Sequence, residues 1–241
     1  MIDYTKLQLI ITSLFIVREQ IFEIFYYRGI LFTPIQKNNF IAYVGEHKNL
    51  RLKIIGDVLT IEGSLCKAYH ASNHINLTIN ELRSVMKEIE SLVGVNARDI
   101  KVIKFEYGIV INVTDMNISF SNFRKYKNIK SEMMRTRGRT YGIQYSNNSQ
   151  KIKIYDKTFE VKRSGIYLDD SFLRIEKCVS TWSIRSRKAF RNLELRNFED
   201  FCSEDVQMAL FDDLYASILK IEILDLDKFK ELSVREIRVY S

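Results

Sequence analysis

The sequence predicts an α+β protein: an antiparallel sheet with helices packed on one face, an open polar face on the other side, and a helical C-terminal tail. Three observations predict this class. Several short segments alternate apolar and polar residues, as strands with one buried face do. Residues 78–93 carry apolar side chains at helical spacing, and the same spacing returns after Phe198.

The first thirty residues fit two structures. Residues 2–11 can form a strand. The alternative is a helix, because apolar residues recur at helical spacing at Leu14, Val17, Ile21 and Ile24. The sequence leaves both open.

Further strands are expected wherever alternation returns between turn-rich segments. Gly56-Asp57 is a glycine-containing tight turn that joins two of these strands into a hairpin. Residues 146–149 form a second turn. The expected strands are 40–44, 52–55, 58–61, 100–113, 139–146, 151–157 and 172–179.

Residues 78–93 form the best-defined helix in the prediction. Thr78 and Glu81 make a capping box at its start, and Gly94 stands where a helix commonly ends. The segment 121–139 is expected to hold a short helix followed by a loop. The chain divides into an α+β domain over 1–195 and a helical tail over 196–241 packed on it.

Composition indicates a protein with a sizeable core in a reducing compartment. Of the 241 residues, 46% are hydrophobic, and the three cysteines are widely spaced without a CxxC pair. The apolar stretch from Leu9 to Val17 is too short to span a bilayer, which takes roughly 20 residues. We therefore expect no membrane partner and a cytoplasmic protein, while the oligomeric state is left open.

Basic residues are concentrated in two runs. Seven lie between Arg124 and Arg139 with Glu132 as the one acid, and a second run extends from Arg185 to Arg196. Such runs suit contact with nucleic-acid phosphates, although solvated loops and helix faces would have the same composition.

Two strand motifs place ionisable groups on one side of the expected sheet. The first is Ile154-Tyr155-Asp156-Lys157 with Glu160, and the second is Leu173-Arg174-Ile175-Glu176. A tyrosine beside carboxylates suits phosphodiester chemistry, because a phenolate can attack phosphorus while a carboxylate-held metal neutralises the developing charge.

Read in order, the motifs resemble those of rolling-circle replication initiators of the phage and plasmid gene II/gene X type. The chain carries Met1-Ile2-Asp3 at its start and Gly63-Ser64-Leu65 ahead of the capped helix. The resemblance continues, in order, through Lys67, Tyr69, His70, Phe105-Glu106-Tyr107-Gly108, Tyr155-Asp156-Lys157, Glu160, Leu173-Arg174-Ile175-Glu176 and the helical tail after Leu195.

The resemblance implies a metal-dependent endonuclease that nicks and rejoins single-stranded origin DNA in a bacterial host, with a host helicase as a candidate partner. Tyr155 is then the nucleophile and Lys157 stabilises the phosphorane. The metal candidates are Glu106, Glu176, Glu160 and His70, and their oxygen ligands favour Mg²⁺ or Mn²⁺. The DNA-binding candidates are Arg124, Lys125, Lys127, Arg135, Arg137, Arg139 and Arg174.

Some alternatives stay open at this point. Tyr141 and Tyr145, on the preceding strand, are rival nucleophiles. The best-known nickases with this chemistry carry a His-hydrophobic-His metal motif, which this chain lacks. Its His70 and His74 stand four residues apart instead. A non-catalytic protein that binds an origin or operator, and a protein-interaction module with an acidic partner, fit the same composition.

Overall fold

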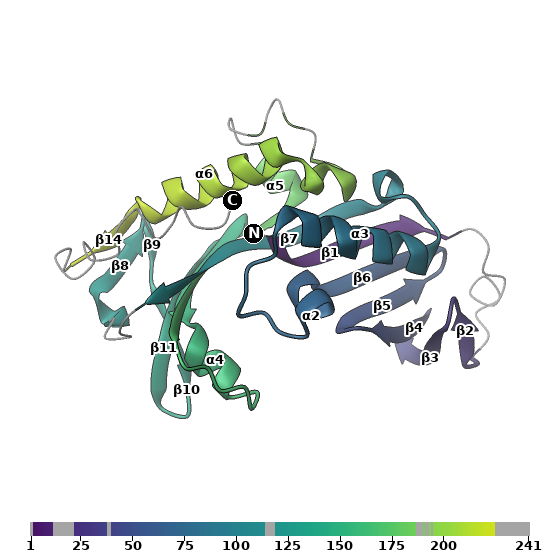
Figure 1. Cartoon of the computed structure of the whole chain (residues 1–241), viewed down its shortest axis with the longest axis horizontal. Helices are drawn as coiled ribbons and strands as arrows, with labels where there is room; N and C mark the ends of the chain where they lie inside the picture. Colours follow the sequence, from purple (N-terminus) through teal and green to yellow (C-terminus); the bar gives the residue numbers. More distant parts are fainter. Residues whose placement is uncertain are drawn as a thin grey trace.

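One large antiparallel sheet dominates the structure, a computed structural model that describes residues 2–11, 22–37, 40–113, 119–186, 190, 193 and 195–224. Its eleven strands have the order β10-β11-β12-β13-β7-β1-β6-β5-β4-β3-β2, and a separate small sheet has the order β14-β8-β9 (Figure 1). Together with its few helices this makes the protein α+β, as the sequence predicts.

The strands of the large sheet are β1 (Ile2–Ile10), β2 (Phe25–Tyr27), β3 (Ile30–Lys37), β4 (Phe40–His47), β5 (Leu50–Ile55), β6 (Val58–Ser64), β7 (Lys101–Val113), β10 (Glu132–Thr136), β11 (Arg139–Ser146), β12 (Gln150–Asp156) and β13 (Ser171–Ser180). The small sheet contains β8 (Phe123–Tyr126), β9 (Ile129–Lys130) and β14 (Ile221–Ile223). The helices are α2 (Leu65–His70), α3 (Ile79–Val93), α4 (Lys157–Lys162), α5 (Thr181–Arg185) and α6 (Glu204–Ile218), with 3₁₀ turns η1 (Ala97–Asp99), η2 (Phe120–Asn122) and η4 (Glu199–Cys202).

Helix α3 begins and ends where the sequence predicts. The Thr78 hydroxyl accepts a hydrogen bond from the Glu81 amide, and the Glu81 carboxylate accepts one from the Thr78 amide at 2.8 Å. Gly94 ends the helix with a φ of 70°, a left-handed conformation that costs glycine little.

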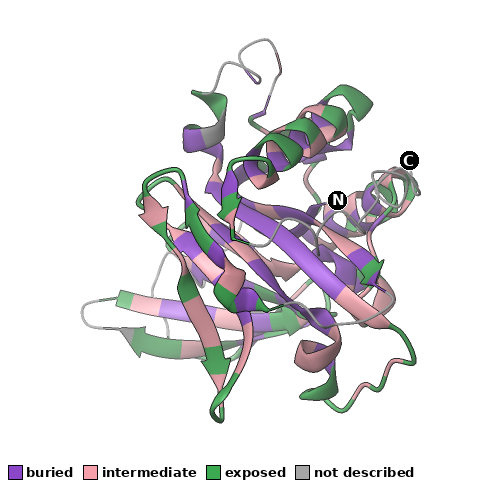
Figure 2. Cartoon of the chain, turned by 90° about the vertical axis from the view of Figure 1, so that its left-hand side faces the viewer, coloured by how far each residue is buried: buried purple, intermediate pink, exposed green. Residues whose placement is uncertain are grey.

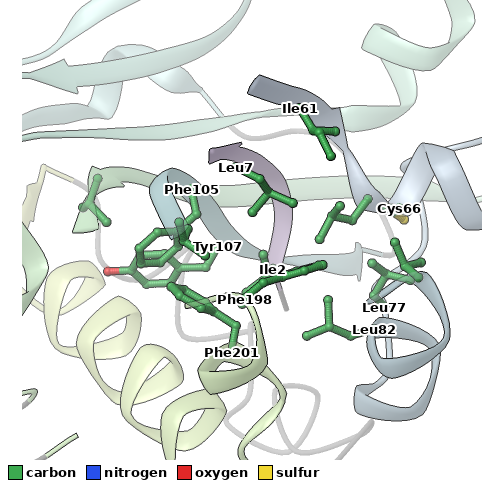
Figure 3. Close-up of a cluster of buried hydrophobic side chains, with 14 of the residues drawn as sticks. Ile2, Leu7, Ile61, Cys66, Leu77, Leu82, Phe105, Tyr107, Phe198 and Phe201 are labelled. Carbon is green, nitrogen blue, oxygen red and sulfur yellow. The ribbon is translucent and has the colours of Figure 1, made fainter. Parts of the chain in front are cut away.

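The main core lies between one face of the sheet and helices α3 and α6. Figure 3 shows Leu7, Ile61, Phe105 and other apolar side chains of the strands meeting Leu82 of α3 and Phe201 of η4. The rings of Phe105 and Phe201 pack edge to face with centroids 4.7 Å apart. The prediction of helices on one face is therefore confirmed for α3 and α6.

Strand β1 resolves the ambiguity of the N-terminal residues. It lies in the middle of the sheet, between β6 and β7. Residues 12–21, which include most of the alternative helix, lie outside the described residues.

The prediction for 121–139 is wrong, because this segment forms β8, β9, β10 and only a 3₁₀ turn at its start. The strands are short and are stabilised by pairing: β10 pairs with the neighbouring β11, and β8 pairs both with β9 and with β14, which is distant in sequence. Local periodicity cannot report such pairing. Strands β2 and β3 and helix α2 were not expected either.

The C-terminal segment described by the structure contains η4, α6 and β14, whereas residues 225–241 lie outside the described residues. Helix α6 buries Val206, Leu210 and Leu214, while Met208 remains 58% exposed. A domain boundary at 195 stays a prediction. Among the described residues, no helix is long and apolar enough to cross a membrane.

Candidate functional site

The two polar strand motifs lie side by side in the sheet. Strand β13 pairs with β12 on one side and with β7 on the other. In this register Tyr155 is opposite Arg174, and Lys153 is opposite Glu176. Because paired residues point to the same face, the candidate residues of the two motifs converge on the face opposite the main core.

Glu176 is the centre of this cluster. Its Oε2 atom accepts hydrogen bonds from Arg174 Nε at 2.7 Å and from the Tyr155 hydroxyl at 3.1 Å. Its Oε1 atom accepts one from Lys153 Nζ at 2.6 Å. The carboxylate is thus held on both oxygens by two cations and a phenol.

Arg174 links the cluster to the N-terminus of the chain. Its guanidinium donates to Asp3 Oδ2 at 2.5 Å and to the carbonyl oxygen of Asn73 at 2.9 Å. Asp3 also accepts a hydrogen bond from the Ser64 hydroxyl, which caps α2. A register shift in β1 between Ile2 and Thr5 inserts an extra residue opposite β7 at this point.

Asp3 and Lys153 are the contributors to the cluster that sequence reasoning did not assign. Asp3 could have been noticed because it is a carboxylate in a strand of mostly buried residues. Carboxylates are seldom buried without a partner, so its position indicates an ion pair. Lys153 gives a weaker signal, since lysines alternate along the whole of β12.

Two glycines allow the strands to approach closely beside the cluster. A Cβ on Gly108 would lie 2.3 Å from the Ile175 carbonyl oxygen, and one on Gly142 would lie 2.4 Å from Tyr155 Cβ. Both glycines pair with cluster residues, Gly108 with Glu176 and Gly142 with Tyr155. Glycine is needed at both positions because a side chain would clash with the neighbouring strand, and not because the backbone conformation requires it.

The cluster is buried, so the expectation that these residues face solvent is wrong. Tyr155 is 5% exposed, Arg174 3% and Glu176 3%, and buried residues run through the middle of the sheet in Figure 2. One cause is the segment 71–78. The carbonyl oxygen of Asn73 in this segment accepts a hydrogen bond from Arg174. The side chain of Asn76 donates to the carbonyl oxygen of Val110 on β7 and accepts from the amide of the same residue.

Burial and pairing shift the pKa values of these groups in different directions. Burial opposes the ionisation of Glu176, but Arg174 and Lys153 outweigh it and lower the pKa of Glu176 to about 2. Burial raises the pKa of Tyr155 well above its usual value. Burial and the charge of Glu176 raise the pKa of Glu106. The cluster therefore contains an ionised Glu176 and a protonated phenol at neutral pH.

Lys157 approaches Tyr155 from a helix and not from the strand face expected for it. Asp156 ends β12 and caps α4, accepting a hydrogen bond from the Phe159 amide at 2.8 Å. Lys157 is fully buried, pairs with Glu160, and holds its Nζ 5.8 Å from the centre of the Tyr155 ring. Burial and the nearby Arg174 lower the pKa of Lys157.

The four metal candidates are not assembled into one centre. Glu106 and Glu176 lie close together but share the ammonium of Lys153, at 3.5 Å and 2.6 Å. Glu160 pairs with Lys157, and His70 lies 3.3 Å from Glu81 on α3. The described residues contain no group of three or more acidic, histidine or cysteine ligands. This donor set fits a lysine ammonium and not a divalent cation, so we derive no step through a metal.

Six of the seven DNA-binding candidates are exposed and one is not. Arg174 is buried in the cluster. Arg139 lies beside the cluster: it is 3.2 Å from Asp156 and its guanidinium is 4.2 Å from the Phe159 ring centre. The exposed candidates are Arg124 and Lys125 on β8, Lys127 after it, Arg135 on β10, Arg137 in the β10–β11 turn and Arg139 on β11. Arg187, Lys188 and Arg191 of the second basic run lie outside the described residues.

No protein-family model matches this chain, and no curated protein matches it by sequence. Among solved structures, the chain is similar to the rolling circle replication initiator protein from Geobacillus stearothermophilus. The TM-score is 0.40 at 11% sequence identity, and the match covers 75% of this chain and 73% of that chain. A similarity of this size assigns no activity.

Proposed function

We propose that this protein is a replication initiator of the rolling-circle type, which binds single-stranded origin DNA and cleaves it through Tyr155. The observation that carries the proposal is the contact of the Tyr155 hydroxyl with Glu176, 3.1 Å long, next to an exposed basic hairpin. The order of motifs along the chain supports the same class.

In the proposed reaction the phenol oxygen of Tyr155, oriented by its hydrogen bond to Glu176, bonds to phosphorus while its proton passes to water. The bond from phosphorus to the 3′ oxygen breaks, and that oxygen takes a proton from water. The DNA then carries its 5′ phosphate on Tyr155, and reversal of these steps rejoins a strand. Arg174 and Lys157 supply positive charge near the phenol.

DNA would reach the cluster along the β10–β11 hairpin. Arg135, Arg137 and Arg139 lie on this hairpin and are exposed. The Tyr141 and Phe159 rings lie 5.7 Å apart beside it, a pair of aromatic surfaces on which unpaired bases can stack. Basic side chains next to aromatic rings suit single strands better than a duplex.

A second candidate function is DNA binding without cleavage. The burial of Tyr155 favours it, because a 5% exposed phenol with a raised pKa is a weak nucleophile until the residues that cover it move. In that case the cluster stabilises the fold, and the hairpin alone contacts DNA.

A covalent-adduct assay separates the two functions. Labelled single-stranded oligonucleotides from the locus of the protein are incubated with it, with Mn²⁺ and with EDTA, and run on a denaturing gel. We expect an adduct that Tyr155→Phe abolishes. The matched control is Tyr141→Phe, whose ring lies 6.5 Å from that of Tyr155 and which should keep the adduct. Salt-sensitive binding without any adduct would favour the non-catalytic function.

A binding assay tests the basic hairpin. Replacing Arg135, Arg137 and Arg139 together by alanine should weaken single-strand binding and reduce the salt slope by about two, at about 0.7 per phosphate contact. Arg98→Ala, an exposed arginine on η1, is the control and should leave the slope unchanged. Unchanged binding in the triple variant would mean that another surface contacts the DNA, whereas a wild-type protein without salt-sensitive DNA binding would favour a protein-interaction module.

A further inference from the structure

Lys153 lies between two carboxylates on the buried face of the sheet. Its Nζ is 2.6 Å from Glu176 Oε1 and 3.5 Å from Glu106 Oε1. The three side chains come from three adjacent strands, β12, β13 and β7. The side chain of Lys153 is 22% exposed, that of Glu106 18% and that of Glu176 4%.

Two carboxylates in one buried place repel each other unless a cation separates them. Glu106 and Glu176 are brought together by the register of β7 with β13, in which Gly108 faces Glu176 and Glu106 faces Cys178. Charge neutralisation here can come from a divalent ion or from an ammonium group. The chain supplies an ammonium on the neighbouring strand.

We propose that Lys153 is a tethered cation, whose ammonium occupies the place between Glu106 and Glu176 that a divalent metal would otherwise take. Lys153 is then a positioning residue. It holds Glu176 with one oxygen directed at the Tyr155 hydroxyl and keeps metal ions out of the pair.

The geometry favours this role over an ordinary surface ion pair. Lys153 contacts both acids at once, whereas Lys6, in the same sheet, pairs with Glu62 at 3.5 Å with both side chains about 40% exposed. A pair as exposed as that contributes little. The carboxylates flanking Lys153 outweigh its burial and raise the pKa of its ammonium, so it stays charged at neutral pH.

The test is Mn²⁺ binding to the full chain, measured from the signal of free Mn²⁺ in electron paramagnetic resonance. The wild-type protein should bind no Mn²⁺ at this pair. Lys153→Met keeps the length of the side chain but removes its charge, and it should bind one Mn²⁺ at least about tenfold more tightly than wild type. Adding Glu106→Gln to Lys153→Met should abolish that gain.

Lys151→Met is the matched control. Lys151 lies on the same strand and the same face, two residues away, with Cys178 as its paired residue. This variant should bind no more Mn²⁺ than wild type. If Lys153→Met does not accumulate as folded protein, Lys153→Gln replaces it, since its amide can still donate to Glu176.

Two results would overturn the proposal. One is a Mn²⁺ site in the wild-type protein that Glu106→Gln removes, because the metal would then bind with Lys153 present. The other is a folded Lys153→Met or Lys153→Gln protein that gains no Mn²⁺ affinity. Neither measurement involves DNA, so the tethered cation can fail while the proposed nicking stands, and the reverse.

The consequence for the reaction rests on the proposed function. If the tyrosine forms an adduct, the wild-type adduct should form in EDTA as well as in Mn²⁺. An adduct that forms only with Mn²⁺ would contradict the proposal that Lys153 takes the place of a metal, without contradicting the nicking activity.

Discussion

Strand β13 has a buried ionic cluster on each of its two faces, and the two clusters differ in composition. Glu176 and Lys177 are consecutive and point to opposite sides of the sheet. On the helix side, Lys177 contacts Asp213 and Ser217 of α6, and the Tyr107 hydroxyl donates to the same aspartate. On the other side, Glu176 belongs to a set with Asp3, Glu106, Arg174, Lys153 and Tyr155.

The difference teaches how to separate a structural cluster from a candidate functional one. Among the described residues, the ion pair of the helix-side cluster joins one cation to one carboxylate, and it fastens α6 to the sheet. The opposite cluster has three carboxylates against two cations in its ion pairs within the described part of the chain, and burial together with the charge of Glu176 raises the pKa of Glu106. Like charges gathered beside a phenol stabilise the fold poorly, and perturbed groups of this kind are commonest at functional sites.

The largest expected effect is that of removing one cation from each cluster. Arg174→Met should lower the free energy of unfolding by about 3–5 kcal/mol, because it leaves Asp3 and Glu176 buried with less compensation. Lys177→Met should cost about 2 kcal/mol, since the Asp213 side chain is 15% exposed and can be hydrated. Urea denaturation at pH 7 measures both.

Lys151→Met, on the same sheet but outside both clusters, is the control and should change stability by less than about 0.5 kcal/mol. An equal loss in Arg174→Met and Lys177→Met would remove the distinction between the two clusters.

The pH dependence of stability gives the next largest effect. The pKa of Glu176 is lowered from 4.5 to about 2 in the folded protein, so its contribution is present above about pH 5 and is lost as the pH falls to about 2. That difference corresponds to about 3 kcal/mol. Urea denaturation at a series of pH values should show this loss in wild type, and Glu176→Gln should show a flatter profile over the same window.

The contribution of Glu106 to stability should change with pH in the opposite direction to that of Glu176. Its pKa is raised by burial and by the charge of Glu176, so the folded protein favours its protonated form and loses stability as the pH rises above 4.5. Glu106→Gln should therefore reduce the decline in stability between pH 4.5 and neutrality. A steeper decline in this variant would mean that Lys153 stabilises the ionised Glu106 more than burial opposes it.

The smallest expected effect concerns two buried tyrosines. Tyr155→Phe removes a hydrogen bond to Glu176 and should cost about 1 kcal/mol. The Tyr145 hydroxyl is buried and has no hydrogen-bond partner among the described residues, so Tyr145→Phe should raise stability by about 1 kcal/mol. Thermal unfolding of the two variants should shift in opposite directions. A loss of stability in both variants would show that the Tyr145 hydroxyl is hydrogen-bonded as well.

The elements that were predictable are those with a local physical cause. The capping box of Thr78 and Glu81 and the apolar stripe of α3 belong to one stretch of chain, and so does the alternation in β7, β11, β12 and β13. The prediction for the segment 121–139 failed because its strands are not set by local sequence alone. Phe123 and Tyr126 of β8 are buried, but one of the two strands that pair with theirs is β14, almost a hundred residues away.

The candidate site divides in the same way. Tyr155, Arg174 and Glu176 could be chosen from the sequence, because alternation places them on the polar face of their strands and a tyrosine beside carboxylates suits phosphodiester chemistry. Their nucleophilic, metal-binding and DNA-binding roles stay predictions. Their burial could not be foreseen, since it depends on segment 71–78 and on α4, which local patterns do not place against the strands.

By itself, the sequence determined the class of fold, the position of the capped helix and which side chains of β12 and β13 share a face, because side-chain periodicity follows from backbone geometry. Only the tertiary structure decided that Asp3 reaches Arg174 across 171 positions of chain and that Lys153 lies between Glu106 and Glu176. The reason is physical: strand order and register are set by the packing of the whole sheet, and charges distant in sequence meet only after that packing is complete.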